Sequence, residues 1–138
     1  MRSRVAVFWL ALVILGLAFA AQVEAGSRLS DVTVDQAREL LRARSGKSNF
    51  VILDVRTPEE FAEGRLAGAV NVNLLAQDFE TRLGQFDRSK TYLVYCRTGN
   101  RSTRAIQIMK RLGFQSVLHM ADGIVVWQKR GFPLAKSS

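Results

Sequence analysis

The sequence predicts one α/β domain built on a mainly parallel β-sheet, preceded by an N-terminal segment of different character. Short apolar runs rich in β-branched and aromatic residues, at 50–55 and 91–95, are typical of strands that are buried on both faces. Segments with helical spacing of apolar residues lie between such runs. This alternation is typical of a sheet whose parallel strands are joined by helices.

The first predicted helix and strand have clear boundaries. Thr33 and Gln36 have the spacing of a capping box, and the apolar positions over 34–41 then follow helical periodicity. Gly46 is suited to ending this helix. The run 50–55, interrupted only by an aspartate, then predicts a buried parallel strand.

A second helix is predicted to start directly after this strand. The sequence TPEE at 57–60 places a capping threonine, a proline in the first turn and a carboxylate three residues on, and Gly64 can end this short helix. Residues 69–72 predict a short strand, and residues 74–83 predict a further helix.

The second half of the domain repeats the alternation. The run TYLVY at 91–95 predicts a strand, after which Ser102 is expected to cap a helix that Gly113 closes. Residues 116–119 predict a last strand, and residues 124–130 predict a final helix.

The N-terminal residues have the pattern of an export signal. Arg2 and Arg4 precede the uncharged run 5–21, and small residues at Val23 and Ala25 predict cleavage after Ala25. The uncharged run has 17 residues, whereas a membrane span needs about 20. We therefore predict a signal peptide over 1–25, with a retained anchor at 5–21 as the alternative. The domain then covers 26–138, and we expect the protein to be exported to a bacterial periplasm.

The charge of the chain points to a small anionic ligand. The formal net charge is +8, which suits nucleic acid, anionic lipid or a small anion. No basic stripe interleaved with aromatic residues is present, so we expect no nucleic-acid partner. Membrane contact is expected only if the segment 5–21 is retained.

The single cysteine of the chain lies where parallel sheets carry their chemistry. Cys96 directly follows the strand 91–95, and ligands of such sheets bind at the carboxyl ends of strands. A loop and a helix start follow it, and their unpaired N–H groups favour an anion. We interpret Cys96 as a nucleophile with increased thiolate character. The proposed substrate-binding residues are Arg97, Thr98, Gly99, Asn100, Arg101 and Ser102.

Two further residues are interpreted as supporting the site. Asp54 ends the buried strand 50–55, and a buried carboxylate needs a partner, for which Arg56 or a loop amide is available. We also expect Arg56 to pair with Glu60. His119, the only histidine, is interpreted as structural, because a general base must lie within hydrogen-bonding distance of the proton that it removes.

Three stretches give the sequence its resemblance to a single-domain rhodanese, a thiosulfate sulfurtransferase. They are VILDVR with EEF and GRLAGAVNV at 51–72, YLVYC with its loop at 92–102, and GIVVW with GFPL at 123–134. The resemblance covers about residues 30–134. It implies a five-stranded parallel sheet with helices on both faces.

The resemblance also implies an activity. The Cys96 thiolate attacks the outer sulfur of thiosulfate, releases sulfite, and passes the sulfur of the resulting persulfide to cyanide or a thiol. The implied partners are thus a small anionic sulfur donor and a thiol or cyanide acceptor, with no cofactor and no metal.

Two other functions remain open at this point. A non-enzymatic persulfide carrier that docks on a partner would use the same loop. A phosphatase or arsenate reductase on the same fold resembles Cys-x5-Arg, whereas Cys96 and Arg101 here have the shorter Cys-x4-Arg spacing. The smaller loop suits the outer sulfur of a donor better than a phosphate ester.

Overall fold

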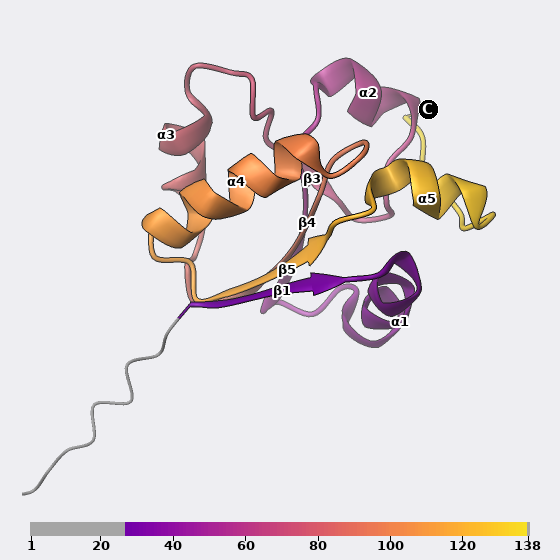
Figure 1. The fold of residues 1–138 in the computed structure, drawn as a ribbon, viewed down its shortest axis with the longest axis horizontal. Helices are drawn as coiled ribbons and strands as arrows, with labels where there is room; N and C mark the ends of the chain where they lie inside the picture. The colour runs from indigo at the N-terminus through magenta and orange to yellow at the C-terminus, as the bar shows by residue number, and fades with distance from the viewer. Residues whose placement is uncertain (1–26, 138) are drawn as a thin grey trace, which may run out of the picture.

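A computed structural model describes residues 27–137 of the chain. The predicted signal peptide at 1–25 and the alternative anchor at 5–21 lie outside the described residues. Within them, five parallel strands form one sheet, and helices pack on both of its faces, as predicted (Figure 1). No helix over residues 27–137 is both long enough and apolar enough to cross a membrane.

The strands are short and lie in an order that differs from their order in the sequence. In space the order is β1-β5-β4-β2-β3. Their bounds are β1 at Arg28–Val32, β2 at Phe50–Asp54, β3 at Val70–Asn71, β4 at Thr91–Tyr95 and β5 at Ser116–Met120.

The helices alternate with the strands along the chain. Their bounds are α1 at Val34–Arg44, α2 at Pro58–Glu63, α3 at Phe79–Leu83, α4 at Asn100–Arg111 and α5 at Gly123–Lys129. Both predicted capping boxes are present: Thr33 with Gln36 starts α1, and Thr57 with Glu60 starts α2.

Three elements differ from the sequence prediction. Strand β1 had no separate prediction, because it lies at the edge of the sheet and its residues are exposed or half-buried, so that they form no apolar run. The helix expected over 74–83 is reduced to α3, since residues 74–78 form turns. Helix α4 begins two residues before Ser102, so Gly99 is its N-cap and Ser102 lies within the first turn.

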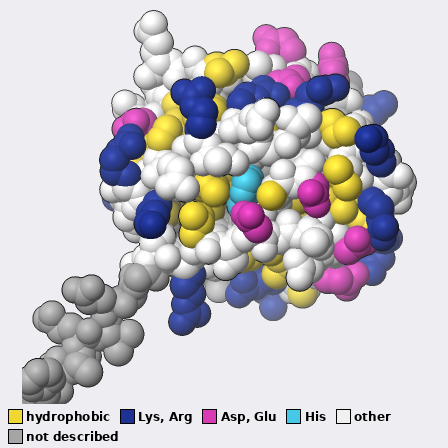
Figure 2. Space-filling view, in the orientation of Figure 1, with side chains coloured by type: hydrophobic (Ala, Val, Ile, Leu, Met, Phe, Trp, Pro, Cys, Tyr) yellow, Lys and Arg dark blue, Asp and Glu magenta, His cyan; other side chains and the backbone are white. Residues whose placement is uncertain are grey.

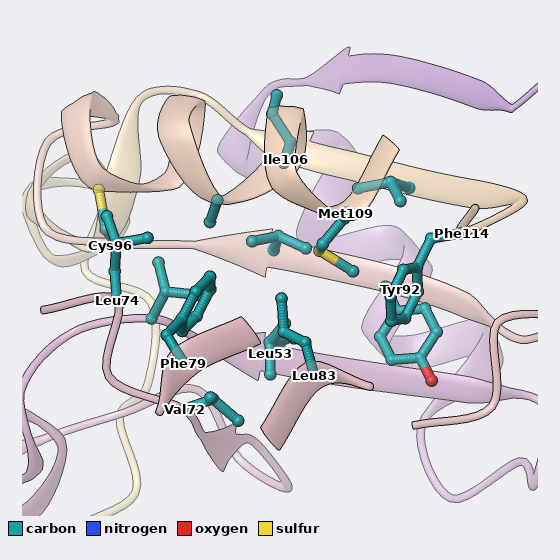
Figure 3. Packing of buried hydrophobic residues seen from close by; sticks show 14 residues of the cluster. Leu53, Val72, Leu74, Phe79, Leu83, Tyr92, Cys96, Ile106, Met109 and Phe114 are labelled. Atoms are coloured by element: carbon teal, nitrogen blue, oxygen red, sulfur yellow. The ribbon is translucent and has the colours of Figure 1, made fainter. Parts of the chain in front are cut away.

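Two apolar layers hold the helices against the sheet. On one face, Phe79 of α3 and Met109 of α4 pack with Leu53 and Val94 of the central strands, as Figure 3 shows for the labelled residues of this layer. The layer on the other face contains Ala37 of α1 and Trp127 of α5. The sheet is therefore buried on both sides, which explains the continuous apolar runs of its central strands.

The topology places one crevice at the carboxyl ends of β2 and β4. From β2 the chain continues to β3 on one side of the sheet, whereas from β4 it continues to β5 on the other side. Connections that diverge in this way leave an opening between the two strands, where α/β sheets bind ligands. Asp54 ends β2 and Cys96 follows β4 at this point.

Candidate active site

Cys96 lies at the carboxyl end of β4 with its sulfur turned toward the start of α4. The residue is 1% exposed and belongs to the apolar layer of that face, at the end where its sulfur points away from the other labelled side chains (Figure 3). The Gly99 N–H donates to Cys96 Sγ at 3.1 Å, and the Ser102 hydroxyl oxygen lies 3.3 Å from Sγ. The loop therefore surrounds the sulfur with polar hydrogens.

These hydrogen bonds decide the ionisation of the thiol. Burial alone raises the pKa of the Cys96 thiol. The Ser102 hydroxyl and the backbone N–H groups of Ser102, Gly99 and Thr98 act in the opposite direction and outweigh burial, so that the pKa lies below its ordinary value. The predicted thiolate character of Cys96 therefore has a structural cause in this loop.

Two glycines fit the cysteine loop against the residues before α5. Gly99 has φ +99°, and a Cβ at this position would lie 2.1 Å from the Ala121 carbonyl oxygen. Gly123 has φ +74°, and its Cβ would lie 2.2 Å from the Arg97 carbonyl oxygen. Both positions therefore require glycine, because the backbone approaches closely in a conformation that side chains disfavour.

Backbone hydrogen bonds then fix the loop to α5. The Ile124 N–H donates to the Cys96 carbonyl oxygen at 2.9 Å, and the Val125 N–H donates to the Arg97 carbonyl oxygen at 3.2 Å. Two of the N–H groups at the start of α5, which have no partner within the helix, are thus satisfied by the cysteine loop.

The predicted substrate-binding residues have different surroundings. Arg97 and Thr98 are exposed on the loop and Asn100 at the first position of α4, whereas Gly99 and Ser102 are buried against Cys96. Arg101 instead forms a bidentate pair with Glu60 of α2, with nitrogen–oxygen distances of 2.6 and 2.8 Å. Arg101 therefore joins α4 to α2, and Glu60 is a site residue that sequence reasoning placed elsewhere.

Asp54 and Arg56 form the buried pair that one of the two sequence interpretations expected. The Arg56 guanidinium donates to both Asp54 carboxylate oxygens at 2.6–3.0 Å and to the Gly64 carbonyl oxygen at 2.6 Å. The expected Arg56–Glu60 pair is wrong, because Glu60 binds Arg101 instead. The two ion pairs, Asp54–Arg56 and Glu60–Arg101, brace the walls of the crevice beside the cysteine loop.

A cleft of about 330 Å³ opens between α2 and α5. Its charged lining residues are Arg56, Glu60, Glu63, Arg97 and Lys136. Because Arg56 and Glu60 are neutralised by their own partners, Arg97 and Lys136 face the single remaining acid, Glu63. The cleft therefore has an excess of positive charge.

Two residues near the sulfur were not predicted as part of the site. His119 Nε2 lies 2.7 Å from the Ser102 hydroxyl oxygen, and His119 Nδ1 lies 3.0 Å from Asp31 Oδ1. The position of His119 at a strand end was the only signal for it in the sequence. Asp31 gave none, because β1 was not recognised as a neighbour of β5.

No metal site is formed by the described residues. Over residues 27–137, no three His, Cys, Asp or Glu side chains gather in a way that could hold a metal ion. The polar groups around Cys96 are mainly N–H and O–H groups, which bind anions rather than cations.

This arrangement of strand, cysteine loop and helix agrees with a comparison to protein families. Residues 37–130 match the family model described as the Rhodanese-like domain. The chain belongs to this family. The rhodanese-like domain therefore spans the cysteine loop, both bracing ion pairs and all but one of the five strands.

Curated relatives and solved structures share the domain. The chain is 35% identical over 114 residues to Thiosulfate sulfurtransferase 16, chloroplastic, of Arabidopsis thaliana, covering 75% of this chain and 91% of that protein. It is 29% identical over 86 residues to a protein named Sulfurtransferase from Allochromatium vinosum, covering 62% of this chain and 78% of that protein. The crystal structure of a rhodanese-related protein from Thermoplasma volcanium has a TM-score of 0.66 at 26% identity, covering 78% of this chain and 99% of that one.

Proposed function

We propose that this protein is a sulfurtransferase that moves sulfane sulfur from a small anionic donor, thiosulfate or a similar compound, to cyanide or a thiol. Cys96 carries the sulfur between the two half-reactions as a persulfide. Membership of the rhodanese-like family and relatives named as sulfurtransferases support the general activity. The persulfide step rests on the geometry of the cysteine loop, whereas the donor and acceptor are those that the resemblance implies.

The observation that carries the proposal is the set of donors around Cys96 Sγ. A buried sulfur that accepts from the Gly99 N–H at 3.1 Å, with the Ser102 hydroxyl 3.3 Å away, is stabilised as an anion. The same donors can stabilise the negative charge of a persulfide that extends by one sulfur atom. A buried structural cysteine has no need of such donors, since a neutral thiol packs as a small apolar group.

The proposed chemistry balances without an external oxidant or reductant. The Cys96 thiolate attacks the outer sulfur of thiosulfate, so that a new S–S bond forms while the S–S bond of thiosulfate breaks. The electron pair of the broken thiosulfate bond leaves with sulfite. Cyanide or an acceptor thiolate then attacks the outer sulfur of the persulfide, and the Cys96 thiolate is the leaving group.

The positive cleft gives the donor a place to bind. Arg97 and Lys136 line it, and both lie at exposed positions where a small divalent anion stays partly hydrated. Arg101 is less suited to contact the donor, because both of its terminal nitrogens are bound to Glu60. We therefore assign donor binding to Arg97 and the bracing of the loop to Arg101.

The same contact argues against phosphate chemistry. A phosphate ester needs a guanidinium that forms two hydrogen bonds with its oxygens, and the Arg101 guanidinium already forms two with Glu60. Access to Sγ is also narrow, since Cys96 is 1% exposed. A terminal sulfur atom fits this access better than a tetrahedral phosphate.

Steady-state formation of thiocyanate from thiosulfate and cyanide tests the proposal. We expect repeated turnover by the wild type, none by Cys96→Ser, and a raised KM for thiosulfate with a nearly unchanged kcat for Arg97→Gln. Lys110→Gln, which changes an exposed lysine outside the cleft, is the matched control and keeps the wild-type KM. Full activity of Cys96→Ser contradicts the nucleophile assignment, and a single equivalent of product per protein indicates a carrier.

We further propose that residues 1–25 direct export to a periplasm. The basic N-terminus, the uncharged run and the small residues before the expected cleavage site support this proposal. The mass of the protein recovered from native soluble and membrane fractions tests it. A soluble product beginning at Gly26 agrees with cleavage, and an uncleaved product in the membrane fraction establishes the anchor instead.

A further inference from the structure

A line of four side chains leads from Cys96 to the edge of the sheet. Cys96 Sγ lies 3.3 Å from Ser102 Oγ, which lies 2.7 Å from His119 Nε2, and His119 Nδ1 lies 3.0 Å from Asp31 Oδ1. The register explains the last contact, because Asp31 of β1 is directly paired with His119 of β5. Paired residues of neighbouring parallel strands project from the same face of a sheet.

This line runs from the interior to solvent. Cys96, Ser102 and His119 are 1%, 0% and 3% exposed, whereas the Asp31 side chain is 73% exposed. Figure 2 shows the one histidine of the chain on this face with an acidic side chain beside it. A cavity of about 440 Å³ lies here, lined by Asp31, His119 and residues of the cysteine loop. It shares no lining residue with the cleft between α2 and α5.

We infer that Ser102, His119 and Asp31 form a proton relay that takes the proton from the Cys96 thiol and returns it, through a cavity separate from the cleft assigned to the sulfur donor. Proton exchange and donor binding then use different openings. The inference rests on the proposed function, because a nucleophile in sulfur transfer must lose its thiol proton. Ser102 contacts the sulfur, and His119 and Asp31 act through Ser102 as positioning residues.

The relay needs no heavy-atom movement. In the thiol state, Cys96 S–H donates to Ser102 Oγ, the Ser102 O–H donates to His119 Nε2, and the Nδ1–H donates to Asp31. Each of the first two protons then shifts by one hydrogen bond. The product is a Cys96 thiolate that accepts from Ser102, next to an imidazolium bound to the Asp31 carboxylate. One proton has moved from sulfur to nitrogen, and nothing has been oxidised or reduced.

Few groups around His119 compete with the relay for its protons. The Ser102 hydroxyl also has the Gly99 carbonyl oxygen at 3.1 Å, but the 2.7 Å separation from Nε2 favours the relay orientation. Asp31 and His119 are the only titratable residues that line the cavity in the described part of the chain. Helix α4, the cysteine loop and β1 contribute only uncharged side chains besides Asp31, namely Leu29, Thr98, Asn100, Thr103, Ile106 and Gln107.

The pH dependence of Cys96 alkylation by iodoacetamide tests the relay in the full-length protein without any sulfur donor. A Cys96 whose proton has passed to His119 stays reactive at a lower pH than a thiol without a proton acceptor. We expect His119→Gln, which preserves hydrogen bonding but cannot take up a proton, to lower the alkylation rate at pH 6 by about tenfold or more, the equivalent of one pKa unit. Asp31→Asn should lower it several-fold.

A control variant keeps the outcomes distinct. Asp35→Asn removes a similarly exposed acid on α1, which pairs with Arg130, and should leave the alkylation profile unchanged. Profiles of His119→Gln and Asp31→Asn that superimpose on the wild type overturn the relay, and if His119→Gln does not fold, exposed Asp31→Asn decides alone. Because alkylation needs no sulfur transfer, a shifted profile without thiocyanate formation leaves the relay standing and refutes the proposed function. Thiocyanate turnover by the wild type together with superimposed alkylation profiles supports the proposed function and overturns the relay.

Discussion

Replacing Arg56 by methionine is expected to destabilise the domain strongly, because it leaves a buried carboxylate without its counter-ion. The Asp54 side chain is 0% exposed and the Arg56 side chain is 6% exposed. Three guanidinium contacts of 2.6–3.0 Å to Asp54 are lost, while the Arg56 backbone N–H at 2.9 Å and the Tyr95 hydroxyl remain as donors. Removing one partner of a buried pair costs about 3–5 kcal/mol. That is a large part of the roughly 5–15 kcal/mol that stabilises a typical domain.

Urea unfolding at pH 7, followed by far-ultraviolet circular dichroism, measures this loss as a decrease in the free energy of unfolding. The double variant Asp54→Leu/Arg56→Met removes both charges. Its free energy of unfolding should decrease by less than that of Arg56→Met alone. The double variant leaves the Arg56 backbone N–H and the Tyr95 hydroxyl without their Asp54 acceptor, at a cost of about 1–3 kcal/mol each, so part of the loss remains.

Two results would refute this reasoning. One is an Arg56→Met variant whose unfolding free energy lies within about 1 kcal/mol of the wild type, since the buried charge then carries no penalty. The other is a double variant that is less stable than Arg56→Met, since the two side chains then contribute independently and not as a pair.

Gly99→Ala should reduce thiocyanate turnover by about tenfold or more while the domain stays folded, because a Cβ lying 2.1 Å from the Ala121 carbonyl oxygen must displace the loop. Gly46→Ala, also at positive φ but with no atom within 4 Å, should cost only about 1 kcal/mol of stability and no activity. Glu60→Gln should lose about 1 kcal/mol at pH 7. The hydrogen bonds from Arg101 lower the Glu60 pKa to about 2, so this stabilisation is complete above pH 4.5 and is lost as pH falls toward 2. Urea unfolding measures the free energy of unfolding of the wild type and of Glu60→Gln. A difference between the two that is the same at pH 7 and pH 2 would contradict the stabilisation by ionised Glu60.

Local signals in the sequence were sufficient for much of the fold. Thr33 and Thr57 each start a helix with the predicted capping box, since the residues involved lie three positions apart. Strand β1 was missed because its short, partly exposed edge position gives no apolar run. The helix expected over 74–83 was too long, because the Asn73 side chain accepts from the Leu75 N–H and supports a turn there.

The candidate site was predictable only where it is contiguous in the chain. The cysteine loop could be interpreted from residues 96–102 because the strand, loop and helix start follow one another. Glu60 and Arg101 are 41 positions apart, and Asp31 and His119 are 88 apart. Such pairs depend on strand order and register, which a single sequence does not specify. The residues added by the structure are therefore those that brace the loop or connect it to solvent.

The mass of the intact protein after incubation with thiosulfate tests the central claim most directly. If Cys96 is the sulfur carrier, the wild type gains the mass of one sulfur atom, fragmentation places it on Cys96, and cyanide removes it. The Cys96→Ser variant should gain nothing under the same conditions. An unchanged wild-type mass, or an added sulfur that survives cyanide, would contradict persulfide chemistry at this cysteine.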